Sequence, residues 1–167
     1  MKSALIKGIV ILPGTVLVFV PSLILWLSSG SPVAGDPAER AEGRWWIGLV
    51  LAVAGFMLAA WTARLFLTLG RGTPAPWAPP RKLVVAGPYR HVRNPMITGV
   101  LLMLAAESLL FGSWLIVGWM LVFFLVHGVY LARMEEPGLE HRFGEDYRRY
   151  KANVPRWIPR VTPWDPS

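Results

Sequence analysis

The sequence predicts an all-α integral membrane protein with four transmembrane helices, a tight hairpin between the third and fourth helices, and a helical C-terminal tail in the cytoplasm. Hydrophobic residues make up 54% of the 167 residues. Charged residues make up only 16%, against about 25% in soluble domains. A soluble fold could not bury that much apolar surface, whereas a membrane fold exposes it to lipid. We therefore expect a single membrane domain over residues 1–167.

Four apolar segments define the expected spans. They cover about residues 4–27, 45–69, 96–110 and 114–132. Each except the third, which is short, approaches or exceeds the ~20 residues that a helix needs to cross ~30 Å of hydrocarbon. Only three residues, 111–113, separate the third and fourth segments, which predicts the hairpin. The first segment is also compatible with a cleaved signal, but its apolar run from Gly8 to Leu27 is longer than a signal core, which favours a retained helix.

The loops predict the orientation. The loop 70–95 carries five basic residues and no acidic one, whereas the loop 28–44 carries three acids against two arginines. The positive-inside rule therefore places loop 70–95 in the cytoplasm, together with both termini and the tail 133–167. Residues 135–151 can form an amphipathic helix, and the prolines after residue 154 exclude one there. The small size of this architecture suggests a prokaryotic inner membrane.

Composition also excludes several classes of function. The chain has no cysteine, which excludes disulfides, thiolate metal sites and a cysteine nucleophile. Its three histidines are too scattered for a zinc motif, so no metal is expected. The net charge of +7 fits basic loops held against anionic lipid, and no nucleic-acid-binding module accompanies it.

Several short motifs occur in a fixed order. A Gly87-x-Tyr89 stretch precedes Arg93-Asn94-Pro95 at the entry to the third span. A Glu135-Glu136 pair follows the fourth span, and the tail continues with Phe143-Gly144-x-x-Tyr147 and Val154-Pro155. Over about residues 66–160 this order resembles the membrane methyltransferase superfamily of isoprenylcysteine carboxyl methyltransferases and phospholipid N-methyltransferases.

The resemblance implies transfer of a methyl group from S-adenosylmethionine to a lipid-embedded or lipophilic acceptor at the cytoplasmic face. The acceptor classes that it implies are an isoprenylcysteine carboxylate and a phospholipid amine. Loop 70–95 and tail 133–167 would form the cofactor site. The cofactor-binding residues carried over from the family are Arg81, Lys82, Leu83, Val84, Tyr89, Asn94, Pro95, Met96, Ile97 and Glu135.

The chemistry of the cofactor adds further candidates. Arg90, Arg93 and the amides at the start of the third span can hold its carboxylate. Glu135 and Glu136 can accept hydrogen bonds from its ammonium or its ribose hydroxyls. Gly99 can permit a close backbone approach. An amine acceptor also needs a base, for which Glu135, Glu136 and His91 are candidates.

The chain departs from the family pattern at three positions. Asn94 and Ile97 stand where isoprenylcysteine enzymes usually have His and Tyr, although Asn also occurs at the first of these positions among bacterial members. Leu131 replaces an arginine expected four residues before the first Glu, and we expect Arg133 to take its place as a catalytic residue beside Glu135.

Glu107 is a separate signal within the apolar third span. A carboxylate at that depth is costly, so it should face protein or water. It can contact the substrate in an acceptor cavity, hydrogen-bond to a neighbouring helix, or lie at the interface. It also supports a different function, that of a small proton-coupled transporter. A nicotinamide-dependent membrane reductase related to this superfamily and a membrane scaffold without a cofactor are compatible with the sequence as well.

Overall fold

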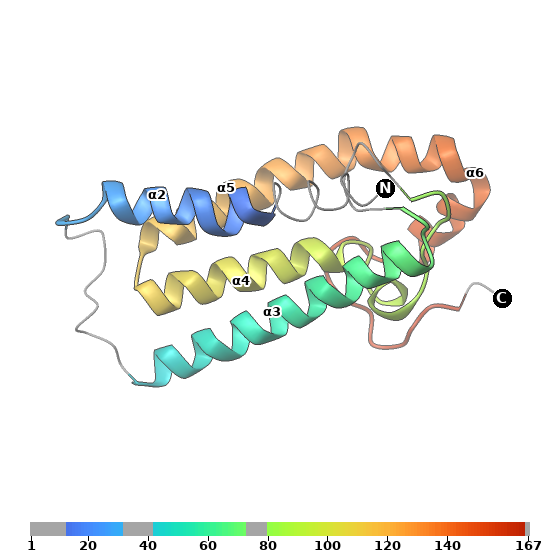
Figure 1. Ribbon diagram of the computed structural model, residues 1–167. Helices are drawn as coiled ribbons and strands as arrows, with labels where there is room; N and C mark the ends of the chain where they lie inside the picture. Colours follow the sequence, from blue (N-terminus) through green and yellow to red (C-terminus); the bar gives the residue numbers. More distant parts are fainter. Residues whose placement is uncertain (1–12, 32–41, 73–79, 166–167) are drawn as a thin grey trace.

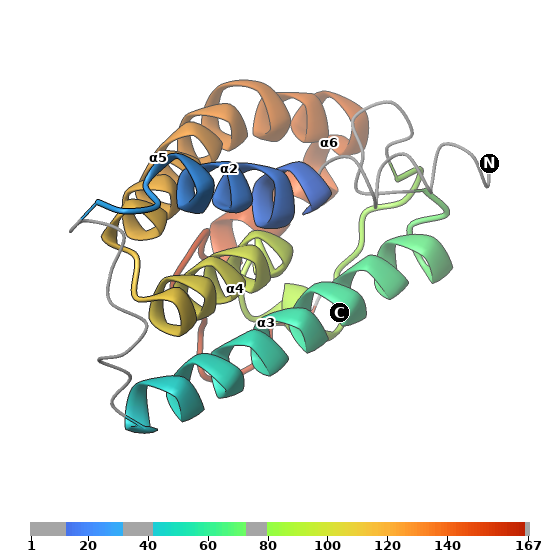
Figure 2. The same ribbon diagram turned by 60° about the vertical axis from the view of Figure 1, so that its left-hand side comes forward.

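The computed structural model describes residues 13–31, 42–72 and 80–165, and every regular element among them is helical (Figure 1). The long helices lie roughly side by side. In both views, α3 and α4 form a pair, and α2 and α5 lie beside that pair (Figures 1 and 2). The bounds of the α-helices are α2 Val20–Leu27, α3 Glu42–Thr68, α4 Pro95–Phe111, α5 Trp114–Tyr130 and α6 Glu136–Asn153. The shorter elements are the π-helical turns η1 Thr15–Phe19 and η5 Leu131–Glu135, and the 3-10 turn η4 Gly87–Arg90.

Among the residues that the structure describes, two helices are long and apolar enough to cross a membrane. One is Gly43–Thr68, within α3, and the other is the helical stretch Trp114–Asn153, which joins α5 to α6 through η5 and is kinked at Gly144, where the backbone is not helical. The helical segments Thr15–Leu27 and Pro95–Phe111 are apolar but shorter. The all-helical class is thus confirmed for the described residues. Residues 4–12 of the first expected span lie outside them, and the four-span topology stays a prediction.

The connection between α4 and α5 consists of two residues. Gly112 has a positive φ of 67°, which a glycine adopts without strain, and it ends α4. Ser113 precedes α5 and donates its amide hydrogen to the Ser108 carbonyl at 3.1 Å. This short turn produces the antiparallel hairpin that the sequence predicts.

Helices α3 and α4 pack closely where two glycines meet. A Cβ atom added at Gly55 would lie 2.6 Å from the Gly99 carbonyl oxygen, and one added at Gly99 would lie 2.8 Å from the Gly55 carbonyl oxygen. Neither position can hold a side chain unless the helices separate. The close backbone approach expected at Gly99 is therefore made by α3, and this contact holds α3 and α4 together.

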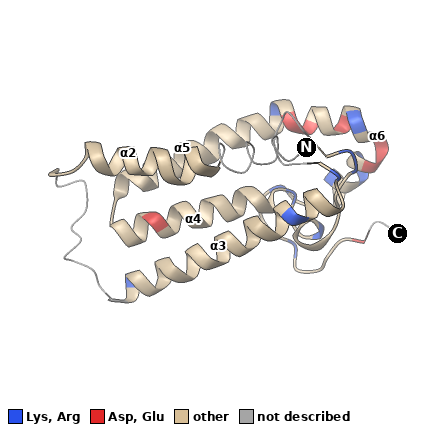
Figure 3. Cartoon of the chain, in the orientation of Figure 1, with Lys and Arg blue, Asp and Glu red and all other residues tan. Residues whose placement is uncertain are grey.

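Charged residues gather at one end of the molecule (Figure 3). They lie on α6, on the segment 80–94 and on the tail, whereas the long shafts of the helices are nearly free of them. Large apolar side chains on these shafts face outward, among them Val50, Phe56 and Met57, each about two-thirds exposed. Such a surface suits a bilayer, with the charged end at a membrane face.

Candidate functional site

The loop after α3 folds back onto the end of that helix. The Gly70 carbonyl accepts hydrogen bonds from the amides of Arg81, at 2.8 Å, and Lys82, at 3.3 Å. A Cβ at Gly70 would lie 2.7 Å from the Phe66 carbonyl oxygen and 3.0 Å from Pro80, so this close return requires glycine. Arg81 and Lys82 extend into solvent, while the next residue pair, 83–84, packs inward.

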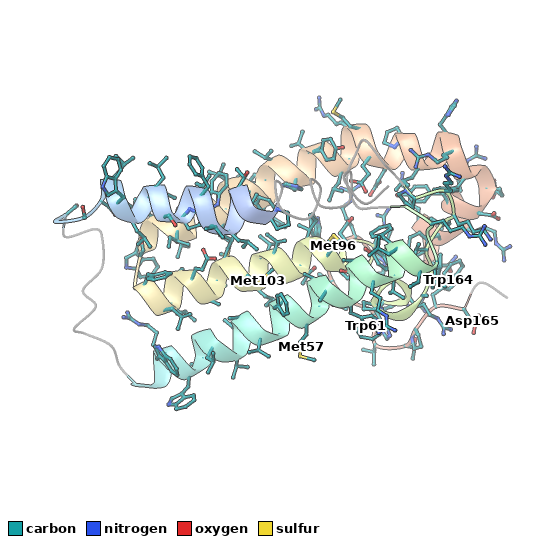
Figure 4. The ribbon with its side chains drawn as sticks, in the orientation of Figure 1. Met57, Trp61, Met96, Met103, Trp164 and Asp165 are labelled. Carbon is teal, nitrogen blue, oxygen red and sulfur yellow. The ribbon has the colours of Figure 1, made fainter. Side chains whose placement is uncertain are left out.

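Tyr89 lies in the short turn η4, which is packed against α3. Gly87 begins this turn with φ +53°, and a Cβ there would meet the Trp61 ring at 3.0 Å. Figure 4 labels Trp61 near the end of α3 that faces the loop. The Tyr89 side chain is buried against the Phe66 ring at a centroid distance of 5.4 Å, and its hydroxyl shares a hydrogen bond with Thr62.

Burial raises the pKa of Tyr89 well above its ordinary value, and the nearby Tyr150 and Glu135 raise it further. Tyr89 is therefore a neutral phenol at physiological pH. Glu135 therefore lies near enough to Tyr89 to affect its pKa, although the two residues are 46 positions apart in the sequence.

The extended end of the tail lies along the segment 90–93. Three backbone hydrogen bonds of 2.9–3.0 Å join them, from Arg93 N to Pro155 O, from Arg160 N to His91 O, and from Trp164 N to Arg90 O. The Arg90 side chain donates to the Trp164 carbonyl at 2.7 Å and pairs with Asp165 at 2.9 Å. Trp164 and Asp165 are labelled in Figure 4. Arg90, predicted to hold a cofactor carboxylate, thus holds the tail.

Glu136 lies at the centre of a cluster of cations. Its side chain is only 5% exposed. Arg156 donates to both carboxylate oxygens, at 2.8 and 2.9 Å, Arg93 pairs with it at 2.9 Å, and Lys151 lies 3.4 Å away. Burial alone would raise the pKa of Glu136, but the hydrogen bond and the surrounding positive charges outweigh it, and the pKa is lowered. Glu136 is therefore ionised and fully engaged.

Glu135 has the opposite environment. Its side chain is exposed, and it forms no ion pair with any residue that the structure describes. The protein that surrounds it nevertheless raises the pKa of its carboxyl, and the negative charge of Glu136 adds to the effect. Of the two adjacent acids, Glu135 is the one that is free to bind a ligand.

The start of α4 adds hydrogen-bond donors. Asn94 stands at the N-cap position, but its side chain donates to the Arg156 carbonyl at 3.3 Å and does not cap the helix. Pro95 follows and has no amide hydrogen. Within the described ranges, no side chain accepts from the amides of Met96 and Ile97, which leaves them available to an anionic group. Figure 4 labels Met96 at this end of α4.

The other predicted residues lie apart from this group. Arg133 is exposed on η5, and its catalytic role stays a prediction. A pocket of about 440 Å³ lies between the segment 83–86, α6 and Trp164, and its lining includes Leu83 and Val84 but neither Tyr89 nor Glu135. The remaining lining residues of the pocket are Leu69, Val85, Ala86, Asp146, Arg149 and Trp164. Glu107, near the C-terminal end of α4, has one buried carboxylate oxygen without a hydrogen-bond partner among the described residues.

Sequence reasoning missed four residues that build the site. Thr62 is fully buried beside Tyr89, and Tyr150 donates its hydroxyl hydrogen to the Tyr89 carbonyl at 2.8 Å. Tyr147 shares a hydrogen bond with Arg93, and burial raises the pKa of Tyr147 to about 12. Arg156 completes the set. Tyr147 was visible as part of the tail motif, but nothing local marks Thr62, Tyr150 or Arg156 as residues of the site.

A sequence profile described as phospholipid methyltransferase matches residues 44–146, which include nearly all of α3, the whole of α4 and α5, and the Glu135-Glu136 pair. The chain belongs to the phospholipid methyltransferase family. Membership implies a membrane-associated methyltransferase and confirms the resemblance seen in the motifs. The tail after residue 146, including Arg156, lies outside the range that matches the family.

One relative is an uncharacterized protein of Haemophilus influenzae. It is 40% identical over 63 residues, which cover 38% of this chain and the whole of the relative. No solved structure matches the chain.

Proposed function

We propose that this protein transfers a methyl group from S-adenosylmethionine to a lipid-embedded or lipophilic acceptor at the cytoplasmic face of the membrane. The observation that carries the proposal is the open carboxylate of Glu135, next to the buried Tyr89 and at the charged end of apolar helices. Membership of the phospholipid methyltransferase family supplies the reaction class.

The free groups of the site fit the charges of S-adenosylmethionine. Glu135 would accept hydrogen bonds from its ammonium or ribose hydroxyls, and the amides of Met96 and Ile97 would hold its carboxylate. Arg81 and Lys82, both exposed on the same loop, add positive potential. Arg90, Arg93 and Glu136 also form contacts that hold the tail, and their roles toward the cofactor stay predictions.

When bound, S-adenosylmethionine supplies an already activated methyl group on a sulfonium. The protein then has to align the acceptor and keep water out. A carboxylate acceptor needs no base. For an amine acceptor, Glu136 is engaged with Arg156, and the His91 Nδ1 atom lies 2.8 Å from the Arg160 carbonyl. Glu135 is the remaining candidate to take the proton. One of its carboxylate oxygens can bind the cofactor while the other accepts the proton, and its raised pKa favours this role.

The proposed orientation places both termini, loop 70–95 and the tail in the cytoplasm, in a prokaryotic inner membrane. The basic loop and the gathering of charge at one end of the helices support it (Figure 3).

Binding of S-adenosylmethionine to the protein in nanodiscs, measured by calorimetry, tests the proposal. We expect the wild-type protein to bind it and Glu135→Gln to bind it at least about tenfold more weakly, the effect of losing one charged hydrogen bond. Glu145→Gln is the matched control, because Glu145 is exposed and pairs only with Arg148 among the described residues. A folded wild-type protein that does not bind S-adenosylmethionine would contradict the proposal, and binding of a nicotinamide cofactor instead would favour a reductase.

A second candidate function rests on Glu107. Its buried oxygen without a hydrogen-bond partner would suit either contact with the acceptor or proton-coupled transport. Glu107→Gln separates the two. Loss of methyl transfer with S-adenosylmethionine affinity retained would place Glu107 at the acceptor. Loss of proton-coupled efflux from cells, in a protein that does not bind S-adenosylmethionine, would support the transporter.

A further inference from the structure

We propose that Arg156 is a positioning residue, which holds Glu136 and thereby orients the adjoining Glu135 toward the cofactor. The proposal rests on the cofactor-binding role of Glu135 given above. It extends the site beyond residue 146, where the match to the family ends.

The contact between Arg156 and Glu136 has the geometry of a specific clamp. The Nε and Nη2 atoms of Arg156 donate to the two Glu136 oxygens at 2.8 and 2.9 Å. This bidentate arrangement fixes the plane of the carboxylate as well as its position. Because Glu136 is only 5% exposed, water competes little for these bonds. The last residue of η5 is therefore followed by a carboxylate that cannot rotate freely.

The backbone of the same tail segment holds the other half of the site. The Arg156 carbonyl accepts from the Asn94 side chain at 3.3 Å, and the adjacent Pro155 carbonyl accepts from the Arg93 amide at 2.9 Å. Asn94 precedes the amides of α4, whereas Glu136 follows Glu135. Two consecutive tail residues thus join the element that carries the amides to the element that carries the open carboxylate.

The role of Arg156 can be separated from folding. Arg93 and Lys151 still pair with Glu136 when the Arg156 guanidinium is removed, so the buried carboxylate keeps cationic partners. The backbone bonds at residues 155 and 156 do not depend on the side chain. We therefore expect Arg156→Gln to fold, with Glu136 held less firmly and Glu135 less well oriented.

The test compares Arg156→Gln and Arg156→Lys with Arg148→Gln in nanodiscs. Arg148 is the matched control, because it is an exposed arginine of the same tail that pairs with Glu140 and Glu145. We expect Arg156→Gln to bind S-adenosylmethionine about tenfold more weakly, the effect of one charged hydrogen bond. We expect Arg156→Lys to be intermediate, since lysine keeps the charge but not the bidentate geometry, and Arg148→Gln to match the wild type.

A second readout needs no ligand. Amide hydrogen exchange across residues 131–137 should be faster in Arg156→Gln than in the wild type and unchanged in Arg148→Gln. Folded Arg156 variants with wild-type affinity would overturn the inference and leave the proposed function intact. If neither Arg156 variant folds, Arg156 stabilises the fold and the positioning role is wrong. A wild-type protein that binds no S-adenosylmethionine would overturn both proposals.

Discussion

At the scale of single residues, Glu135 and Glu136 show how two identical neighbours acquire different properties. Glu136 is buried among Arg93, Arg156 and Lys151, and its pKa is lowered. Glu135 is exposed, has no described ion pair, and its pKa is raised. One residue therefore contributes to stability and the other is free for binding, and each makes a separate prediction about pH.

Glu136 should stabilise the fold at neutral pH and lose this effect in acid. Because its pKa is lower in the folded protein, its contribution is fully present above the ordinary glutamate pKa of 4.5. The contribution is lost as the pH falls through the lowered value. Glu136→Gln leaves Arg93 buried without an anionic partner, which costs about 3 kcal/mol at pH 7. Thermal unfolding between pH 7 and pH 3 should show this difference shrink below about pH 4. A difference that is constant over that range would contradict the assignment.

Glu135 should make the affinity for S-adenosylmethionine depend on pH. Its pKa is raised, whereas the pKa of Glu136 is lowered. A raised pKa means that Glu135 takes up its proton at a higher pH than an ordinary glutamate does. The protonated acid attracts an ammonium less well, so S-adenosylmethionine affinity should begin to fall above the ordinary value of 4.5 as the pH is lowered. Calorimetry over a pH series measures this, and Glu135→Gln should remove the effect. A midpoint below 4.5 would show that Glu135 is not the group responsible.

The sequence alone identified the Glu135-Glu136 pair, but it did not show that Glu136 is buried in ion pairs while Glu135 is exposed. The motif order was sufficient to select Tyr89 and Glu135. The partners of Glu136 come from residue 93 and from residues 151 and 156, and such long-range pairings leave no local pattern. In the same way, the sequence contains no sign that Arg90 pairs with Asp165 and Arg93 with Glu136. Their predicted role in binding an anionic ligand stays a prediction.

At the scale of elements, the helix bounds were largely predictable. The apolar segments expected at 45–69, 96–110 and 114–132 appear as helices that differ by at most three residues at any end. The continuation of α5 into α6 was not predicted as one helix, because the change from apolar to charged residues at residue 133 resembles the end of a span. The apolar segment ends at these charged residues, but the helical backbone continues past them. The helix propensities of these residues do not predict whether the helix ends or continues there.

The packing of α3 against α4 should depend on Gly99. A side chain at this position meets the Gly55 carbonyl at 2.8 Å and Ala59 beyond it, so Gly99→Leu should push the helices apart. We expect a loss of about 2 kcal/mol or more, as for other overpacked sites. Gly118→Leu on α5 is the control, because a Cβ there meets no described atom within 4 Å. Thermal unfolding in detergent compares them, and equal stability of the two variants would argue against the glycine contact.

At the scale of the whole molecule, the distribution of charge predicts the topology. The protein has no cysteine, so single cysteines can be introduced without a background signal. Ser29 and Thr162 are exposed at opposite ends of the proposed arrangement. In intact cells, a membrane-impermeant maleimide that reaches the outer face should label Ser29→Cys, and it should label Thr162→Cys only after lysis. Labelling of both variants from the same side would contradict the four-span orientation.

The central claim is that this protein methylates an acceptor in the membrane and that Glu135 binds the S-adenosylmethionine used in this reaction. Its most direct test is the transfer of a radiolabelled methyl group from S-adenosylmethionine into the lipid extract of membranes that contain the protein. The account predicts label in that extract with the wild type and with Glu145→Gln, and loss of most of it with Glu135→Gln. Transfer that Glu135→Gln sustains at the wild-type rate, or a wild-type protein that binds S-adenosylmethionine and labels no membrane component, would contradict the claim.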